Sequence, residues 1–305
     1  MTVIYFGSTK FSLPIVKTIK ENFDLLGVVV IKPKPGGRGL KIVQSEVAQW
    51  AQDVGVQFFS PDNPNEDNFI ENLSKLKPDI FVLSAYGHIL GPHLLEIPRL
   101  GSVNIHPSLL PKYRGAAPIQ RVLMAGEKKT GITVFFMDEK IDHGSIIFQK
   151  DLTIEPYENH GSLADRLSML GAEIVVDVLK SIDAGTYKKI SQDERDKTYA
   201  PKITKEEMYI NWQLGIEKVF NLIRALFPKP GARTLFRNKE LIIFHALPGD
   251  KKLAPGLIAI ANKNVYVGTG DGSVILKELK LESGSMITGL DFINGYRIKE
   301  GEKLQ

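Results

Sequence analysis

The stretch Ser102-Val-Asn-Ile-His-Pro-Ser-Leu-Leu-Pro-Lys-Tyr-Arg-Gly-Ala-Ala-Pro-Ile-Gln120 carries the strongest structural signal in the chain. It begins as a short apolar run, which favours a buried strand, and continues at once into a loop rich in proline and glycine. Residues two apart on a strand point to the same face, so Asn104 and His106 project side by side. An amide can donate to an oxyanion and an imidazole can carry a proton. The pair therefore indicates acyl-group transfer chemistry.

Strand-like and helix-like segments alternate around this stretch through the first 185 residues. Five β-rich apolar runs favour strands: Val3–Phe6, Leu25–Ile31, Ile80–Ser84, Ser102–Ile105 and Ile132–Phe136. Three amphipathic segments favour helices: Val43–Val54, Glu66–Leu76 and Ser162–Ile182. Strands separated by helices predict right-handed βαβ units, and hence an α/β fold with a Rossmann-like, mostly parallel sheet. Ligands of such sheets bind outside the carboxyl ends of the strands, which is where Asn104 and His106 lie.

The imidazole of His106 requires a third group to orient it, and Asp142 is the best candidate. Asp142 lies in the loop Met137-Asp-Glu-Lys-Ile-Asp-His-Gly144, which directly follows a predicted strand. The loop therefore lies at the carboxyl end of that strand, and we expect it at the same edge of the sheet as Asn104. The neighbouring Asp138 and Glu139 are interpreted as capping or solvent residues. His143 could pair with His106 around a metal ion, but further ligands are missing, so no metal is expected.

The pattern changes after about residue 185, and the length of 305 residues fits two domains. We predict a catalytic domain at 1–187, a polar linker at 188–206 and a second domain at 207–305. In the second domain a helical stretch, Gly215–Leu226, precedes short apolar runs that glycine and proline separate. This arrangement is typical of a small, OB-like β-barrel. The short runs are Leu241–His245, Leu257–Ala261, Val265–Val267 and Val274–Leu281.

The composition is that of an ordinary soluble protein. Hydrophobic residues make up 43% and charged residues 24% of the chain. No run of about 18 apolar residues is present, so no membrane span is expected. The first residues read as a strand rather than as a signal peptide, and there are no cysteines. We therefore expect a cytoplasmic protein without disulfides or a thiol nucleophile.

Two basic segments suggest contact with nucleic-acid phosphates. The loop Lys32–Lys41, which includes Arg38, holds four cations, three glycines and no acidic residue. The stretch Lys218–Lys239 holds six cations and no acidic residue, with phenylalanines between them. A mobile solvated loop and a solvated helix face followed by an edge strand are the respective alternatives. Gly7–Phe11 contains too few glycines for a dinucleotide-binding fingerprint and is interpreted as a tight turn.

These residues together resemble the methionyl-tRNA formyltransferase family, within the wider folate-dependent formyltransferases. The resemblance runs nearly end to end. The Asn-x-His pair and the distal aspartate are shared with the wider family. The motifs that carry the resemblance are Asn104-Ile-His-Pro-Ser-Leu-Leu-Pro111, Arg114-Gly-Ala-Ala-Pro-Ile-Gln120, Gly131-Ile-Thr133, Met137-Asp138, Thr198-Tyr-Ala-Pro-Lys202 and Trp212. Lys10 and His143 depart from the family pattern without removing a catalytic group.

The resemblance implies a formyl transfer from 10-formyltetrahydrofolate, as a small-molecule donor, to the methionine amine of initiator Met-tRNA. It implies a catalytic trio of Asn104, His106 and Asp142. We also expect no metal, no membrane and a monomer. The folate contacts that the resemblance implies are Ser108, Leu109, Leu110, Pro111, Tyr86, Gly87 and Ile89. The tRNA contacts expected from charge are Arg38, Lys41, Lys229, Arg233 and Arg237. A sugar-nucleotide N-formyltransferase and a non-catalytic RNA-binding protein are the rival hypotheses.

Overall fold

The computed structural model describes residues 1–33, 35–36, 41–281 and 284–305, without the side chains of 35–36 and 41–42. The described chain forms two compact units, each built from segments that are separate in sequence. The first unit comprises Met1–Ala116, Lys129–Thr153 and Ala164–Ala200, and the second comprises Ala117–Lys128, Ile154–Leu163 and Pro201–Gln305.

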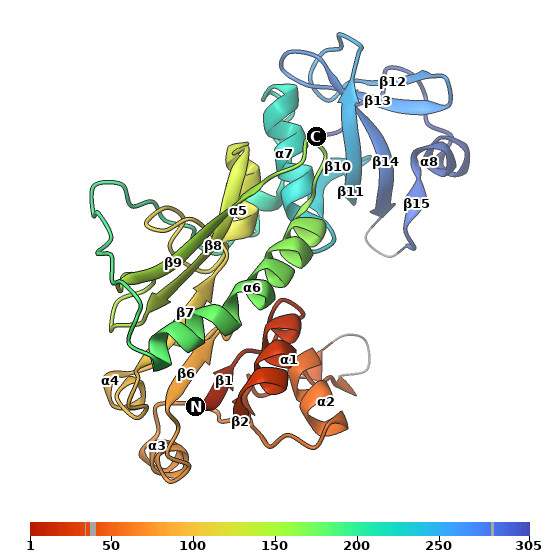
Figure 1. The fold of residues 1–305 in the computed structure, drawn as a ribbon. Coiled ribbons are helices and arrows are strands. Elements are labelled where there is room, and N and C mark those ends of the chain that lie inside the picture. Colours follow the sequence, from red (N-terminus) through yellow and green to blue (C-terminus); the bar gives the residue numbers. More distant parts are fainter. Residues whose placement is uncertain (34, 37–40, 282–283) are drawn as a thin grey trace. The chain divides into compact units, whose positions relative to one another are not determined.

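A seven-stranded sheet is the centre of the first unit (Figure 1). Its strand order is β5-β2-β1-β6-β7-β8-β9. The first five of these strands run parallel, whereas β8 and β9 pair antiparallel, which confirms the mostly parallel sheet. The strands are β1 (Thr2–Phe6), β2 (Asp24–Val29), β5 (Phe58–Phe59), β6 (Ile80–Leu83), β7 (Ser102–His106), β8 (Lys129–Phe136) and β9 (Ile146–Thr153).

Helices cover both faces of this sheet, which explains why a central strand such as β6 is apolar along its whole length. Ile4 and Phe6 of β1 pack against the helices α3 and α4, whereas the hydroxyl of Tyr5 donates to the Ser12 carbonyl of α1 on the other face. Gly171 of α6 lies against Ile15 of α1. The helices are α1 (Ser12–Asn22), α2 (Glu46–Asp53), α3 (Asp67–Ser74), α4 (Pro92–Leu95) and α6 (His160–Asp183). The short ribbon β3 (Pro35–Gly36) and β4 (Lys41–Ile42) completes the list.

One step of the sequence reasoning is wrong: β8 is not a parallel strand. Its register places Thr133 beside His106 and Phe136 beside Val103. The carboxyl end of β8 therefore lies beside the beginning of β7, not beside its end. Antiparallel strands at the edge of an otherwise parallel sheet are common, and no helix separates β8 from β9. The loop after β8 consequently starts at the opposite end of β7 from His106.

The second unit has an antiparallel sheet of its own, with the order β10-β11-β14-β13-β12 and β15 beside β14. Its C-terminal residues pair with both edges, because Leu304 bridges Phe236 and Lys303 bridges Leu257. These two bridges close the sheet into a barrel-like arrangement. The elements are α5 (Pro118–Ala125), η1 (Glu206–Met208), α7 (Ile216–Leu226), β10 (Ala232–Phe236), β11 (Lys239–Gly249), β12 (Ile258–Ala261), β13 (Asn264–Gly268), β14 (Ser273–Leu281), β15 (Ile287–Thr288) and α8 (Gly289–Tyr296). Among the described residues, no helix has the length and apolarity that crossing a membrane requires.

Candidate active site

His106 lies at the end of β7, where Nε2 is hydrogen-bonded and Nδ1 faces a carboxylate. The side chain is 5% exposed, Nε2 lies 3.0 Å from the Tyr113 carbonyl oxygen, and Nδ1 lies 3.6 Å from Asp142 Oδ2. A carbonyl oxygen can only accept a hydrogen bond, so Nε2 carries a hydrogen whenever this bond is made. Nδ1 is therefore the nitrogen that can gain or lose a proton, and it faces a carboxylate.

Asp142 lies between the two residues of β7. Its Oδ1 accepts from Asn104 Nδ2 at 3.4 Å, and its Oδ2 accepts from the Gly115 backbone N–H at 2.8 Å. Asp142 has a φ of 49°, a left-handed conformation that aspartate adopts more readily than most residues. This turn carries the loop back along β7, so the structure brings Asn104, His106 and Asp142 together although β8 runs antiparallel.

The loop after β7 approaches another chain segment very closely at Gly115. Its φ is 125°, and a Cβ atom there would lie 2.8 Å from the Ala200 carbonyl oxygen. Both facts require glycine at this position. The close approach permits main-chain bonds, in which Arg114 N–H donates to the Thr198 carbonyl at 2.9 Å and Ala200 N–H donates to the Arg114 carbonyl at 2.7 Å. The loop that supplies Tyr113 and Gly115 to the site is thereby fixed to residues 198–200.

Gln192 is a site residue that sequence reasoning missed. Its Nε2 donates to the carbonyl oxygens of Asp142 and Gly144, both at 2.9 Å. Its Oε1 accepts from Nε and Nη2 of Arg114, at 3.0 and 2.7 Å. Both amide hydrogens and both oxygen lone pairs are thus used. The segment that the sequence assigns to a polar linker therefore connects the two loops of the site. No local signal distinguishes Gln192 from a solvated glutamine.

Charged groups surround this connection. Glu194 Oε1 accepts from Arg114 Nη2 at 2.8 Å and Glu194 Oε2 accepts from Lys197 at 2.9 Å, which together lower the pKa of Glu194 to about 2. His143 Nδ1 lies 2.6 Å from Asp138 Oδ2, so His143 pairs with Asp138. Over the described ranges of the chain, no three His, Cys, Asp or Glu side chains are grouped as metal ligands would be.

The loop Ser108–Pro111 is tied to the neighbouring strands. Thr133 Oγ1 donates to the Ser108 carbonyl at 2.6 Å and accepts from Leu110 N–H at 3.1 Å. Gln149 Nε2 donates to the Leu110 carbonyl at 2.7 Å. The isobutyl group of Leu109 lies against Gly131 of β8. A loop with this many fixed atoms can form a rigid wall for a ligand.

The other predicted folate residues follow β6, whose carboxyl end lies beside that of β7. Tyr86 is 3% exposed, and its hydroxyl has no hydrogen-bond partner within the described part of the chain. Burial raises the pKa of this phenol. Gly87 has a φ of 88°, and Ile89 is exposed. The loops after β6 and β7 therefore leave the sheet at the same edge, where ligands of α/β sheets bind.

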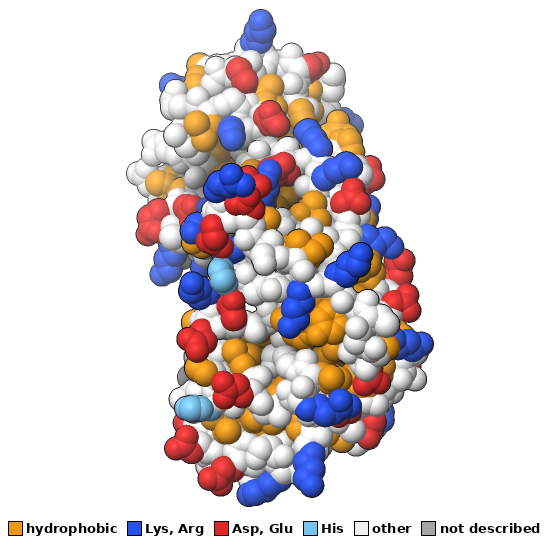
Figure 2. All heavy atoms as spheres, turned by 60° about the vertical axis from the view of Figure 1, so that its left-hand side comes forward, with side chains coloured by type: hydrophobic (Ala, Val, Ile, Leu, Met, Phe, Trp, Pro, Cys, Tyr) orange, Lys and Arg blue, Asp and Glu red, His pale blue; other side chains and the backbone are white. Residues whose placement is uncertain are grey.

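The stretch Lys218–Lys239 exposes less unpaired positive charge than its sequence suggests. Of its six cations, Arg224 is buried and adds no charge to the surface. Arg233 pairs with Glu240 at 2.8 Å and Arg237 pairs with Glu302 at 2.7 Å, with acids from outside the stretch Lys218–Lys239. Basic and acidic side chains are similarly interspersed on the face drawn in Figure 2. Arg38 and the side chain of Lys41 lie outside the described residues. Lys229 is exposed.

Sequence comparison places the chain among known formyltransferases. The profile described as formyl transferase matches residues 1–179, and the profile of the formyl transferase C-terminal domain matches residues 202–297. The methionyl-tRNA formyltransferase of Carboxydothermus hydrogenoformans is 41% identical, with 100% of each chain covered. That of Dictyoglomus thermophilum is 39% identical, again over 100% of each chain.

Solved structures share the fold at low sequence identity. An N-formyltransferase from Helicobacter canadensis, in complex with folinic acid and dTDP-3-aminofucose, has a TM-score of 0.69 at 20% identity and covers 90% of this chain and 98% of its own. HypX from Aquifex aeolicus, in complex with tetrahydrofolic acid, has a TM-score of 0.70 at 18% identity and covers 99% of this chain and 48% of its own. With its catalytic-domain match and its full-length relatives, the chain belongs to the formyl transferase family, among the methionyl-tRNA formyltransferases.

Proposed function

We propose that this formyltransferase moves the formyl group of 10-formyltetrahydrofolate to the α-amino group of methionine on initiator tRNA. The observation that carries the proposal is the convergence of Asn104, His106 and Asp142 at the end of β7. In the reaction the amine nitrogen attacks the formyl carbon and forms the new C–N bond. The bond from that carbon to folate N10 breaks, N10 gains a proton, and the amine loses one.

Asn104 is proposed to stabilise the oxyanion that forms on the formyl oxygen. One of its two amide hydrogens points to Asp142 Oδ1 at 3.4 Å, a long bond, and the other remains available to the substrate. A donor fixed in advance costs no reorganisation in the transition state. Such a donor typically contributes about 10²–10³-fold to the rate.

His106 is proposed to accept the amine proton at Nδ1 and return it to the leaving nitrogen. The Tyr113 carbonyl fixes Nε2 as the protonated nitrogen, so the ring cannot exchange tautomers without losing that bond. Asp142 Oδ2, 3.6 Å from Nδ1, stabilises the imidazolium form. Gln192 acts through Asp142, because it holds the main chain on both sides of His143 in place.

The two substrates are proposed to bind to different segments of the chain. Ser108–Pro111 with Tyr86, Gly87 and Ile89 would hold the folate, since their loops share the edge of the sheet with the trio. Residues 207–305, with Lys229, Arg233 and Arg237, would hold the body of the tRNA, while 1–187 carry the chemistry and 188–206 join the two. Arg38 and Lys41 would contact the acceptor stem.

The test is a formyl-transfer assay with purified enzyme and 10-formyltetrahydrofolate. Initiator Met-tRNA and a dTDP-amino sugar are supplied separately and then together as competing acceptors. We expect formylmethionyl-tRNA and no formylated sugar. Transfer to the amino sugar alone would replace the proposal with a sugar-nucleotide N-formyltransferase, and transfer to neither acceptor would refute both.

A further inference from the structure

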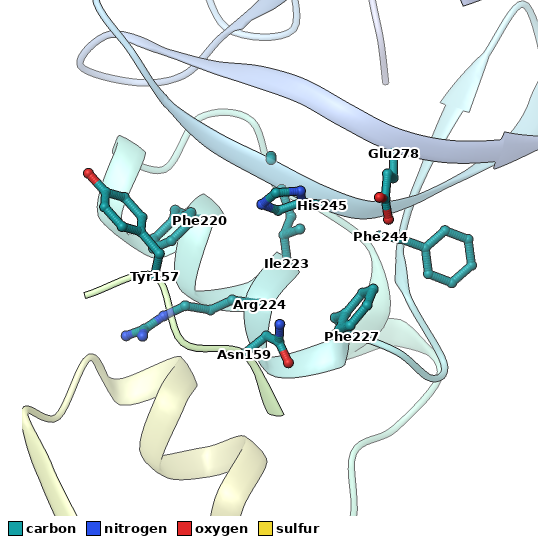
Figure 3. A pocket seen from close by; sticks show the side chains of 10 residues that line it. Tyr157, Asn159, Phe220, Ile223, Arg224, Phe227, Phe244, His245 and Glu278 are labelled. Atoms are coloured by element: carbon teal, nitrogen blue, oxygen red, sulfur yellow. The ribbon is translucent and has the colours of Figure 1, made fainter. Parts of the chain in front are cut away.

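A cavity of about 120 Å³ lies within the second unit (Figure 3). None of its lining residues belongs to the proposed catalytic site. Side chains of α7, β11 and β14 line it, together with two residues of the segment Ile154–Leu163. Four of its ten lining residues are phenylalanine or tyrosine. The lining residues used below are Tyr157, Asn159, Phe220, Arg224, Phe244, His245 and Glu278.

An irregularity in β11 shapes this cavity. Phe244, His245 and Ala246 all line it, although consecutive residues of a regular strand point to opposite faces. The pairing of β11 with β14 shifts register on both sides of His245, which lies opposite Glu278. Bulges of this kind redirect side chains and are common beside functional sites. The irregular pairing thus brings His245 of β11 and Glu278 of β14 to the same wall of the cavity.

The polar groups at the cavity have unused hydrogen-bonding capacity. Within the described ranges, neither the His245 imidazole nor the Glu278 carboxylate makes a hydrogen bond or ion pair with another protein group. Asn159 Oδ1 accepts from Ser162 N–H at 3.0 Å, which leaves its NH₂ group available. Figure 3 shows Glu278 and His245 reaching down from the sheet and Asn159 lying below them. One acceptor and two donors therefore surround the same space.

A buried cation completes the wall. Arg224 is 6% exposed, donates to Asn221 Oδ1 at 2.8 Å and to the Glu158 carbonyl at 3.1 Å, and lies over the Phe220 ring at 5.4 Å. Burial lowers the pKa of Arg224, whereas the negative charges of Glu158 and Glu217 raise it, so these glutamates partly balance the buried charge.

The volume selects the size of the ligand. A cavity of 120 Å³ holds about four waters at roughly 30 Å³ each, and a cavity of about 150 Å³ accepts benzene. The space is thus close to the size of one six-membered ring and too small for a whole nucleotide. Tyr157 and Phe220, with ring centroids 6.0 Å apart, offer aromatic surface on which bases of single-stranded RNA stack.

We propose that this cavity, here called the aromatic pocket, binds one unpaired cytosine of RNA; this rests on the proposed function, which supplies tRNA as a substrate. Cytosine presents an amino donor and two acceptors along its pairing edge. The Glu278 carboxylate accepts from the amino group, as acidic side chains do from cytosine N4. The His245 and Asn159 N–H groups donate to the two acceptors. Uracil places a carbonyl where cytosine has its amino group, and a carboxylate repels it.

The first experiment measures fluorescence anisotropy of labelled tetracytidylate and tetrauridylate on the full chain at low salt. We expect tetracytidylate to bind about tenfold more tightly, the discrimination typical of one well-placed base contact. Glu278→Gln should remove this preference, because an amide can accept or donate at the same place. Glu300→Gln, an exposed glutamate outside the pocket, makes the same charge change and should retain it. Phe244→Ala should weaken both oligonucleotides.

Equal binding of the two oligonucleotides by the unaltered protein, or an intact preference in Glu278→Gln, would overturn the proposal. Formylation of Met-tRNA is assayed in parallel to separate the two hypotheses. Formylation without a cytosine preference would leave the proposed function standing and refute the pocket. A cytosine preference without formylation would support the pocket as an RNA site and refute the proposed function.

Discussion

The end of β7 and the basic stretch Lys218–Lys239 differ in how residues from elsewhere in the chain affect them. At the end of β7 the two side chains proposed to react lie on one strand, and the additional bonds from Asp142, Tyr113 and Gln192 make the geometry more definite. In the basic stretch, residues from elsewhere have the opposite effect. They pair with Arg233 and Arg237, and burial removes Arg224 from the surface.

The difference shows which properties can be predicted from a short stretch of sequence alone. Side-chain direction on a strand is a local property, with a period of two residues. Net surface charge is a property of the folded surface, because an exposed arginine pairs with whichever acid the fold places beside it. Predictions about geometry from a motif are therefore more secure than predictions about charge from a count.

The largest effect should come from the trio. Asn104→Ala and Asp142→Ala should each lower kcat by about 10²–10³-fold, because the first removes an oxyanion donor and the second frees His106 and the Gly115 loop. Steady-state kinetics with both substrates measures this, and urea unfolding checks that the fold persists. Near-normal turnover in a folded Asn104→Ala variant would contradict its assigned role.

A smaller effect should come from Gln192, which touches the site through the backbone. Gln192→Glu keeps an acceptor for Arg114 but loses both donors to the Asp142 and Gly144 carbonyls. We expect kcat to fall on the order of tenfold to a hundredfold with both KM values little changed, since small displacements of a positioned group are costly.

Arg195→Ala is the matched control for Gln192, because Arg195 lies on the same segment and pairs with Asp193. It should leave kcat unchanged. A merely structural role for Gln192 would instead lower stability and the fraction of active enzyme at constant kcat per active site. An equal loss in both variants would also argue against a positioning role.

Within the basic stretch, the effects of single cations should be unequal. Lys229→Ala should weaken tRNA binding more than Arg233→Ala. Arg233 already pairs with Glu240, so its positive charge contributes little to the attraction of RNA phosphates. Salt titrations of tRNA binding measure this, with folate binding as the unaffected reference. A larger effect of Arg233 than of Lys229 would indicate that Arg233 leaves Glu240 when tRNA binds.

The smallest effect should appear at low pH. Arg114 and Lys197 lower the pKa of Glu194 to about 2 from its unfolded value of 4.5. A lowered carboxyl pKa contributes stability that is fully present above 4.5 and lost as the pH falls towards 2. Glu194 is half exposed, so solvent reduces this contribution. Urea unfolding should give the wild type a higher free energy of unfolding than Glu194→Gln at pH 6, and this difference should be smaller at pH 3. A constant gap would show that the ion pairs contribute nothing.

The sequence predicts the sheet, the barrel-like second unit and the side-by-side placement of Asn104 and His106, because all three depend on local periodicity. Sequence reasoning named Asp142 for an incorrect reason. Its loop was expected at the edge of a parallel strand, and it reaches His106 through a left-handed turn at the end of an antiparallel strand. Gln192 was out of reach, since its role depends on contacts with Arg114 and Asp142 that are 78 and 50 residues away in sequence.

The most direct test of the account is a double-mutant cycle of Asn104→Ala and His106→Ala in single-turnover formyl transfer to initiator Met-tRNA. If the two side chains act as one unit on one transition state, the double variant should be about as slow as the slower single variant. Folate and tRNA dissociation constants should stay close to those of the unaltered enzyme. Rate losses that multiply, or losses that arise from weaker substrate binding, would contradict the account.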